Sequence, residues 1–196
     1  AWLTYAFYAL VAWGVAAVLA AFRALSTGTR MSVLLRLGFG VWLVVPAYLA
    51  NAGVLSQFDA MPPMLVRVVV PMVVLIVTFS FSRAGAWAAE RLPFGLLIAV
   101  QIFRLPLEVL LHQLHGHRVL PVQMTFAGLN FDILPGASAL VLGVLHRRGG
   151  VSPSVLRMWN TIGLALLVTI VTLAVLSFPK PFRLFTPQNQ IVAYFP

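Results

Sequence analysis

Residues 101–136 read QIFRLPLEVLLHQLHGHRVLPVQMTFAGLNFDILPG, a polar stretch within a strongly apolar chain. It contains two of the chain's four carboxylates and three of its four histidines. In its first half the polar residues recur at spacings of three and four, which places them on one face of a helix. The stretch therefore predicts helices that pack around a polar interior.

The composition of the whole chain indicates what surrounds that interior. Of its 196 residues, 61% are hydrophobic and 9% are charged, and the mean hydropathy is +0.99. Soluble domains are roughly 45–50% apolar and about 25% charged, so no soluble fold could bury this much apolar surface. The composition predicts an all-α, polytopic transmembrane helical bundle.

Six apolar segments have about the 20 residues that one membrane crossing needs. We expect them to form a single transmembrane domain over residues 1–196. Beyond them, residues 178–196 are expected to follow the outer interface or to lead into a seventh helix. The predicted helices cover about residues 2–25, 33–51, 65–82, 94–115, 122–145 and 155–177.

Lysine and arginine are unevenly distributed over the connections between these segments. Cytoplasmic connections carry the excess of positive charge, which predicts a bacterial inner-membrane protein with an external N-terminus. The net charge of +9 arises mostly from these connections and not from a basic patch. We therefore expect no nucleic-acid partner. The richer side carries Arg23, Arg30, Arg36, Arg83, Arg91, Arg147, Arg148 and Arg157, and the other side carries Arg67, Arg118, Lys180 and Arg183.

The polar stripe, which consists of Gln101, Arg104, Glu108, His112 and His115, is expected to form one site with the following segment. A charge at the bilayer centre costs about 2.5–3.5 kcal/mol, so the stripe must face other helices or water. At 1.5 Å per residue, Glu108 lies roughly 12 Å below the outer end of its helix, and Asp132 lies at about the same depth in the next helix. The short connection makes these helices antiparallel neighbours. The predicted ligand or proton site consists of Arg104, Glu108, His112, Asn130 and Asp132.

Three chemistries remain open for these residues. In a binding site, Arg104 is the anion contact or counter-ion, Glu108 and Asp132 share a proton, and His112 relays it. In a purely structural reading, Arg104 and Glu108 form a buried ion pair that only fixes helix packing, and Asn130 and Asp132 complete its hydrogen bonds. A metal site is the weakest alternative, because no HExxH-like motif is present. Its ligands would be Glu108, His112, His115 and Asp132.

Two prolines indicate breaks close to these charges. Pro106 lies inside the polar stripe, and Pro135 precedes Gly136 just beyond Asp132. Proline removes a backbone donor and bends a helix, and membrane proteins tolerate such breaks where they line a cavity.

Three function classes fit the sequence. The first is a membrane protein that binds a small solute or a proton in an outer-half pocket, for transport or sensing. The second is an accessory subunit that docks on a larger membrane complex through Ala12, Ala16 and Ala20, where small side chains permit close helix packing. The third is an enzyme acting on a lipid-like substrate with the same carboxylates, which we favour less. No motif identifies a cofactor.

Several runs resemble a group of uncharacterised bacterial multi-spanning membrane proteins. The resemblance extends from Ile98 to Pro196, assigns no activity, and implies that one more apolar segment follows. The runs are FRLPLEVLLHQL, LPVQMTFAGLNFDILPG, WNTIGLALL, AVLSFPKPF and VAYFP.

Overall fold

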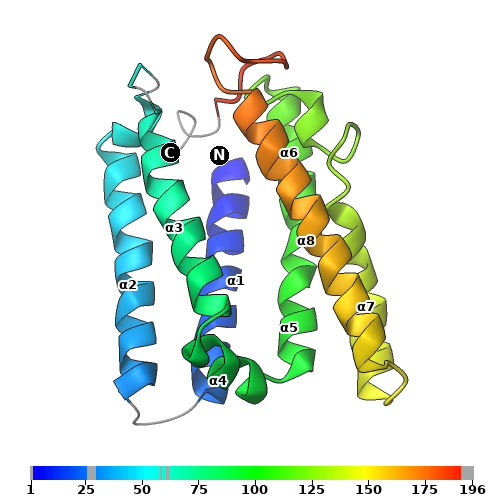
Figure 1. Ribbon diagram of the computed structural model, residues 1–196. Helices are drawn as coiled ribbons and strands as arrows, with labels where there is room; N and C mark the ends of the chain where they lie inside the picture. The colour runs from blue at the N-terminus through cyan, green and yellow to red at the C-terminus, as the bar shows by residue number, and fades with distance from the viewer. Residues whose placement is uncertain (1, 26–29, 58, 61, 191–196) are drawn as a thin grey trace. The chain divides into compact units, whose positions relative to one another are not determined.

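The structure is a computed structural model that describes residues 2–25, 30–57, 59–60 and 62–190. Every regular element in these residues is helical (Figure 1). The α-helices are α1 (Trp2–Ala24), α2 (Arg30–Asn51), α3 (Met64–Ser80), α4 (Arg83–Arg91), α5 (Phe94–Val100), α6 (Arg104–Gly116), α7 (Ile133–Arg147) and α8 (Pro153–Leu176). Three short 3₁₀ helices are η1 (Val54–Ser56), η2 (Gln101–Phe103) and η3 (Val122–Met124).

Four stretches among the described residues are long and apolar enough to cross a membrane. They are α1, residues Ser32–Asn51 of α2, the combined stretch Phe94–Gly116, and α8. The bent pair of α3 and α4 would make a fifth span, whereas α7 is a shorter apolar helix. The predicted all-helical fold with several candidate spans is confirmed, but the expected count of six spans is not.

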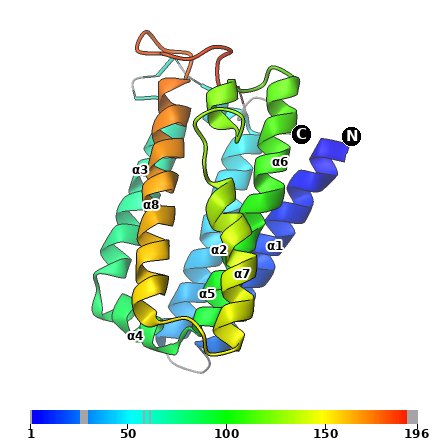
Figure 2. The same cartoon turned by 90° about the vertical axis from the view of Figure 1, so that its right-hand side faces the viewer.

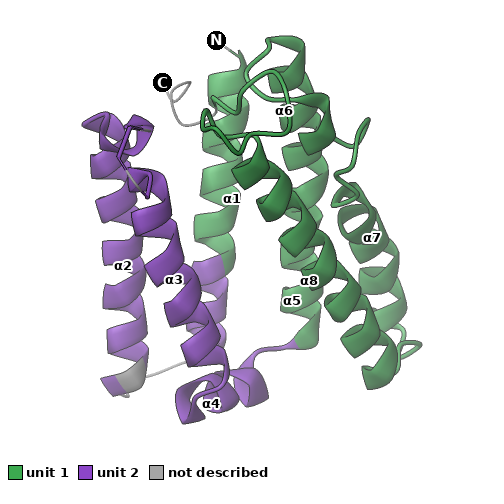
Figure 3. Cartoon of the chain, turned by 45° about the horizontal axis from the view of Figure 1, so that its top comes forward, with its two compact units in different colours: residues 1–17, 94–191, 196 green, residues 18–93, 192–195 purple. Residues whose placement is uncertain are grey.

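The chain folds as two compact units (Figure 3). The described part of the first unit comprises residues 2–17 and 94–190, and the second unit lies within residues 18–93. The expectation of a single domain therefore stays a prediction. A seventh helix beyond Pro196 lies outside the described residues.

In the second unit, the segment after α3 is helical, although the sequence analysis treated it as a connection. Ser82 caps α4: its Oγ accepts a hydrogen bond from the Gly85 N–H at 3.1 Å. A Cβ atom at Gly85 would lie 2.2 Å from the Phe79 carbonyl oxygen, so the 72° bend between α3 and α4 requires glycine there. Serine at the N-cap satisfies donors that a helix start would otherwise leave free.

In the first unit, α5, η2 and α6 form one interrupted helix. Pro106 has no N–H to donate to the carbonyl of Ile102, and its ring crowds that carbonyl. The 3₁₀ turn η2 lies at this position, where the backbone tightens instead of continuing as α-helix. The sequence-based expectation of a distortion beside Pro106 agrees with this geometry.

The helix expected from Val122 instead begins at Ile133. Residues 122–132 form η3 and a compact loop with internal hydrogen bonds: Thr125 Oγ1 donates to the Val122 carbonyl, and Gly128 N–H donates to the Thr125 carbonyl. A Cβ atom at Gly128 would lie 2.4 Å from the Val122 oxygen, so only glycine fits. At 1.5 Å per residue, α7 is roughly 22 Å long, less than a full crossing.

An apolar core joins one end of α6 to the end of α8 and the start of α1. Its fully buried centre is Leu120, which follows α6 and packs with side chains of α6, η3 and α8. The tail after α8 turns back onto this region, because Asn189 N–H donates to the Ser177 carbonyl and Gln190 N–H donates to the Val119 carbonyl. Figure 2 shows α7 beside α5, at the other end of the α5–α6 stretch.

Candidate functional site

The start of α7 lies in direct contact with the start of α6. A Cβ atom at Gly136 would lie 3.0 Å from the Leu105 nitrogen and 3.1 Å from Arg104 Cβ. Glycine therefore permits the two helices to approach each other this closely. The approach places Asp132, the residue before α7, opposite Arg104.

Arg104 and Asp132 form a buried ion pair. Arg104 Nη1 lies 2.5 Å from Asp132 Oδ1, and their side chains are only 8% and 6% exposed. The contact has the distance of an ion pair but not the angles of a hydrogen bond. Arg104 Nε donates a hydrogen bond to Gln101 Oε1 at 2.8 Å. The structural alternative, in which Arg104 pairs with Glu108, does not match this geometry, because Arg104 contacts Gln101 and Asp132 instead.

Glu108 is instead paired with Asn130. Asn130 Nδ2 donates to Glu108 Oε1 at 2.7 Å and to the Met124 carbonyl at 3.0 Å. Asn130 Oδ1 accepts from the Asp132 N–H at 3.1 Å. Both amide hydrogens and the oxygen are thus used, and Asn130 and Glu108 are each 1% exposed. Asn130 anchors the loop before α7 to the middle of α6.

Three buried polar atoms near this pair have no hydrogen-bond partner among the described residues: Glu108 Oε2, His112 Nδ1 and Gln123 Oε1. His112 lies one turn from Glu108, and its ring stacks on Phe126 at 4.6 Å between centroids. Buried polar atoms in proteins nearly always have a partner, which is a protein group, a water molecule or a ligand. These atoms therefore mark positions where a proton, water or solute would complete the network.

The metal alternative is not supported by the geometry. Among the residues that the structure describes, no three His, Cys, Asp or Glu side chains gather as metal ligands do. The rings of His112 and His115 lie 6.4 Å apart, and His115 Nδ1 is 3.1 Å from the Leu120 carbonyl oxygen. His115 thus fixes the chain after α6 and does not join the charged cluster.

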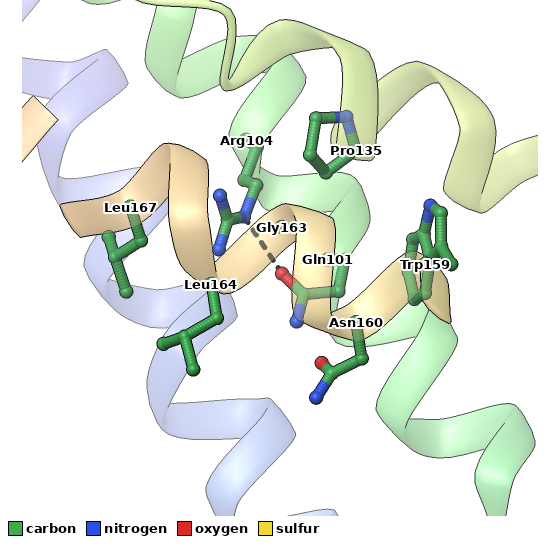
Figure 4. Close-up of a pocket in the computed structure, with 8 residues that line it drawn as sticks. All are labelled: Gln101, Arg104, Pro135, Trp159, Asn160, Gly163, Leu164 and Leu167. Carbon is green, nitrogen blue, oxygen red and sulfur yellow. Dashed lines mark hydrogen bonds between the residues drawn. The ribbon is translucent and has the colours of Figure 1, made fainter. Parts of the chain in front are cut away.

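A cavity of about 150 Å³ lies beside Arg104, on the side of α8 (Figure 4). Gly163 presents bare backbone to it, and Trp159 is held by a 2.8 Å hydrogen bond from Nε1 to Ser138 Oγ of α7. Figure 4 shows Gln101 and Arg104 side by side over α8, joined by their hydrogen bond. The cavity is lined by Gln101, Arg104, Pro135, Trp159, Asn160, Gly163, Leu164 and Leu167.

The structure thus brings four of the five predicted site residues into one cluster of contacts, and it places His112 next to them on α6. The sequence analysis missed the contribution of α8. Asn160 is a polar amide within the largely apolar helix α8, and Gly163 lies one turn away. This amide could have indicated that α8 takes part in the site.

Comparison of the chain with protein-family models, with curated proteins and with solved structures gives no match.

Proposed function

We propose that this chain is an integral membrane protein that binds a proton or a small solute at its buried polar cluster, in a transport or sensing role. The cluster consists of Arg104, Glu108, His112, Asn130 and Asp132. The observation that carries the proposal is the state of Glu108: one carboxylate oxygen is bound by Asn130, and the other is buried without a partner among the described residues.

A purely structural network would satisfy that second oxygen, because a buried polar atom without a partner costs roughly 1–3 kcal/mol. In a binding site, by contrast, the second oxygen of Glu108 is the position that a proton or solute occupies. When a proton occupies Oε2, the carboxyl group becomes neutral and gains a donor. His112, one helical turn from Glu108 on α6, is suited to pass that proton, because one nitrogen of a neutral imidazole ring accepts a proton while the other donates one.

The test is infrared difference spectroscopy of the whole chain in lipid nanodiscs during a pH titration. Glu108→Gln should remove a carboxylic-acid C=O band that the parent chain shows, while Glu90→Gln should leave that band in place. Glu90 suits as the control because its side chain is 77% exposed. A parent spectrum that Glu108→Gln leaves unchanged would refute proton binding at Glu108.

We further propose that the chain resides in a bacterial inner membrane with its N-terminus external. The asymmetric distribution of arginine and lysine supports this orientation. Under it, Arg30 lies on the cytoplasmic side and Asp59 on the external side.

A second candidate function is that of an accessory subunit. Ala12 and Ala16 lie four residues apart on one face of α1, and both are exposed. Small exposed side chains on a span allow another helix to approach closely. Ala16→Leu would then dissociate a larger complex on a native gel, whereas under the binding-site proposal it leaves the proton titration intact.

A further inference from the structure

The cavity beside α8 presents more hydrogen-bond donors than acceptors. Arg104 has five N–H donors, and its contacts with described residues involve only Nε and Nη1. Because Gln101 Oε1 accepts a hydrogen bond from Arg104, the NH₂ group of Gln101 remains to donate a hydrogen bond to a ligand. The Asn160 amide has no hydrogen bond to another described residue and adds a further donor.

The opposite wall of the cavity is apolar and leads to the surface of α8. Leu164 and Leu167 are 58% and 40% exposed, while Gly163 and Pro135 form the floor. Gly163 lies ten residues from the first residue of α8, so at 1.5 Å per residue it is roughly 15 Å along this span and close to its middle. In a membrane-spanning α8, Gly163 would therefore lie at the depth of lipid acyl chains.

The size of the cavity restricts the ligand. Sites that enclose a drug-sized molecule have about 300–1,000 Å³, whereas this cavity has about 150 Å³. It accommodates a head group of a few atoms. The rest of such a ligand must lie outside the cavity, against the exposed leucines.

We propose that this cavity binds the carboxyl head of a single-chain amphiphile, such as a fatty acid, that enters sideways past Leu164 and Leu167. A carboxylate accepts two parallel hydrogen bonds from a guanidinium group, which makes Arg104 its principal contact. Gln101 and Asn160 supply the remaining donors. The proposal rests on the proposed function, because Arg104 and Asp132 take part in both.

Charge balance follows from the ion pair. An apolar route favours entry of the neutral acid, since a bare carboxylate is costly in hydrocarbon. In the cavity the O–H bond of the acid breaks and its carboxylate binds Arg104 N–H groups that Gln101 and Asp132 leave free, while the proton passes to Asp132 Oδ1, which contacts Arg104 Nη1 but does not itself line the cavity. The net charge of the cluster is unchanged, so no further ion is needed.

The test uses bromododecanoic acid and the whole chain in nanodiscs. Trp159 lines the cavity, so bromine in the acyl chain should quench the fluorescence component that Trp159→Phe removes. We expect saturable quenching by the acid and at least tenfold weaker apparent affinity for bromododecanol, which has the same chain and no carboxyl group. Equal affinity for acid and alcohol would overturn recognition of the carboxylate.

Gly163→Leu locates the site. The added Cβ meets Pro135 at an ordinary 3.8 Å, and the rest of the leucine fills the cavity, so saturable quenching should disappear. Ala165→Leu adds comparable bulk at an exposed position of α8 outside the cavity and should leave quenching unchanged. Undiminished quenching in a folded Gly163→Leu would place the ligand elsewhere.

Asn160→Ala keeps the proposal falsifiable if Gly163→Leu does not fold. It removes one donor at an exposed position, and the affinity for the acid should fall about three- to tenfold, whereas the affinity for the alcohol should stay the same. Unaltered affinity for the acid would contradict the proposed role of the donors. Failure of the Glu108 infrared test with intact acid binding would refute proton binding at Glu108 alone.

Discussion

Charged side chains occupy different positions in the two units. Within residues 18–93 they lie near helix ends, as in the pair Glu90 and Arg91 of α4, whose side chains are 77% and 45% exposed with 3.8 Å between charged atoms. In the α5–α7 region, Arg104 and Asp132 are almost fully buried within the fold. Exposed pairs contribute roughly 0–1 kcal/mol, while removing one partner of a buried pair costs about 3–5 kcal/mol. The same residue types thus lie exposed near a helix end in one region and form a buried candidate site in the other.

The largest expected effect comes from Arg104→Ala. This variant leaves Asp132 buried without its counter-ion and should lower the free energy of unfolding by about 3–5 kcal/mol. Arg91→Ala is the matched control and should change it by less than about 1 kcal/mol. The measurement is unfolding by sodium dodecyl sulfate in mixed micelles. Equal stability of the two variants would show that the buried pair contributes no more to stability than the exposed pair.

The next effect is expected at the contact between α6 and α7. Gly136→Ala places a Cβ atom 3.0 Å from the Leu105 backbone nitrogen, so the helices must separate at a cost of about 1–3 kcal/mol. Gly143→Ala on the same helix meets only Ile98 Cγ2 at 3.8 Å, an ordinary contact, and should be tolerated. Micelle unfolding of both variants checks this. Equal tolerance would mean that α7 does not approach α6 as closely as described.

A smaller effect is expected at the bend between α3 and α4. Ser82→Ala removes the side chain that caps α4 and should cost about 1 kcal/mol. Ser154→Ala provides the comparison, because this exposed serine follows the capping residue Ser152 of α8. Unfolding of both variants under the same conditions gives the difference. A Ser82→Ala variant as stable as Ser154→Ala would show that the bend does not depend on the cap.

The orientation of the chain can be tested with little effect on stability. The chain contains no cysteine, so single variants can be labelled from outside intact cells with an impermeant maleimide. Asp59→Cys should be labelled and Arg30→Cys should not. Both variants react after the membrane is permeabilised, which is the control. The reverse pattern would invert the proposed orientation.

The sequence predicted the long helices because an apolar run bounded by charges and turn residues leaves few alternatives. It did not predict α4, because nine residues with three charges resemble a connection unless Ser82 is taken as a cap. It also extended the helix of α7 back over residues 122–132. The whole run of residues 122–145 is long enough for a span, and Thr125, Gly128 and Asn130 are the residues that indicate a turn.

For the candidate site, the helical spacing in α6 and the short connection to the next segment were sufficient to group Arg104 and Glu108 with Asn130 and Asp132. The depth expected for Asp132 assumed a helix over residues 122–132, and this assumption is wrong. The spacing and the connection were not sufficient to assign the pairs. A long arginine side chain can turn along its own helix or across to a neighbour, and here the close approach at Gly136 directs it to Asp132. The cavity could not be predicted, because its walls come from separate helices whose packing the sequence pattern does not determine.

The most direct measurement of the central claim is a double-mutant cycle on Arg104 and Asp132, compared with the same cycle on Glu90 and Arg91. Each residue is replaced by alanine singly and together, and the free energy of unfolding of every variant is measured in mixed micelles. The buried cluster predicts a coupling of about 2–3 kcal/mol between Arg104 and Asp132, and less than about 1 kcal/mol between Glu90 and Arg91. A coupling for Arg104 and Asp132 as small as that of the exposed pair would contradict the account.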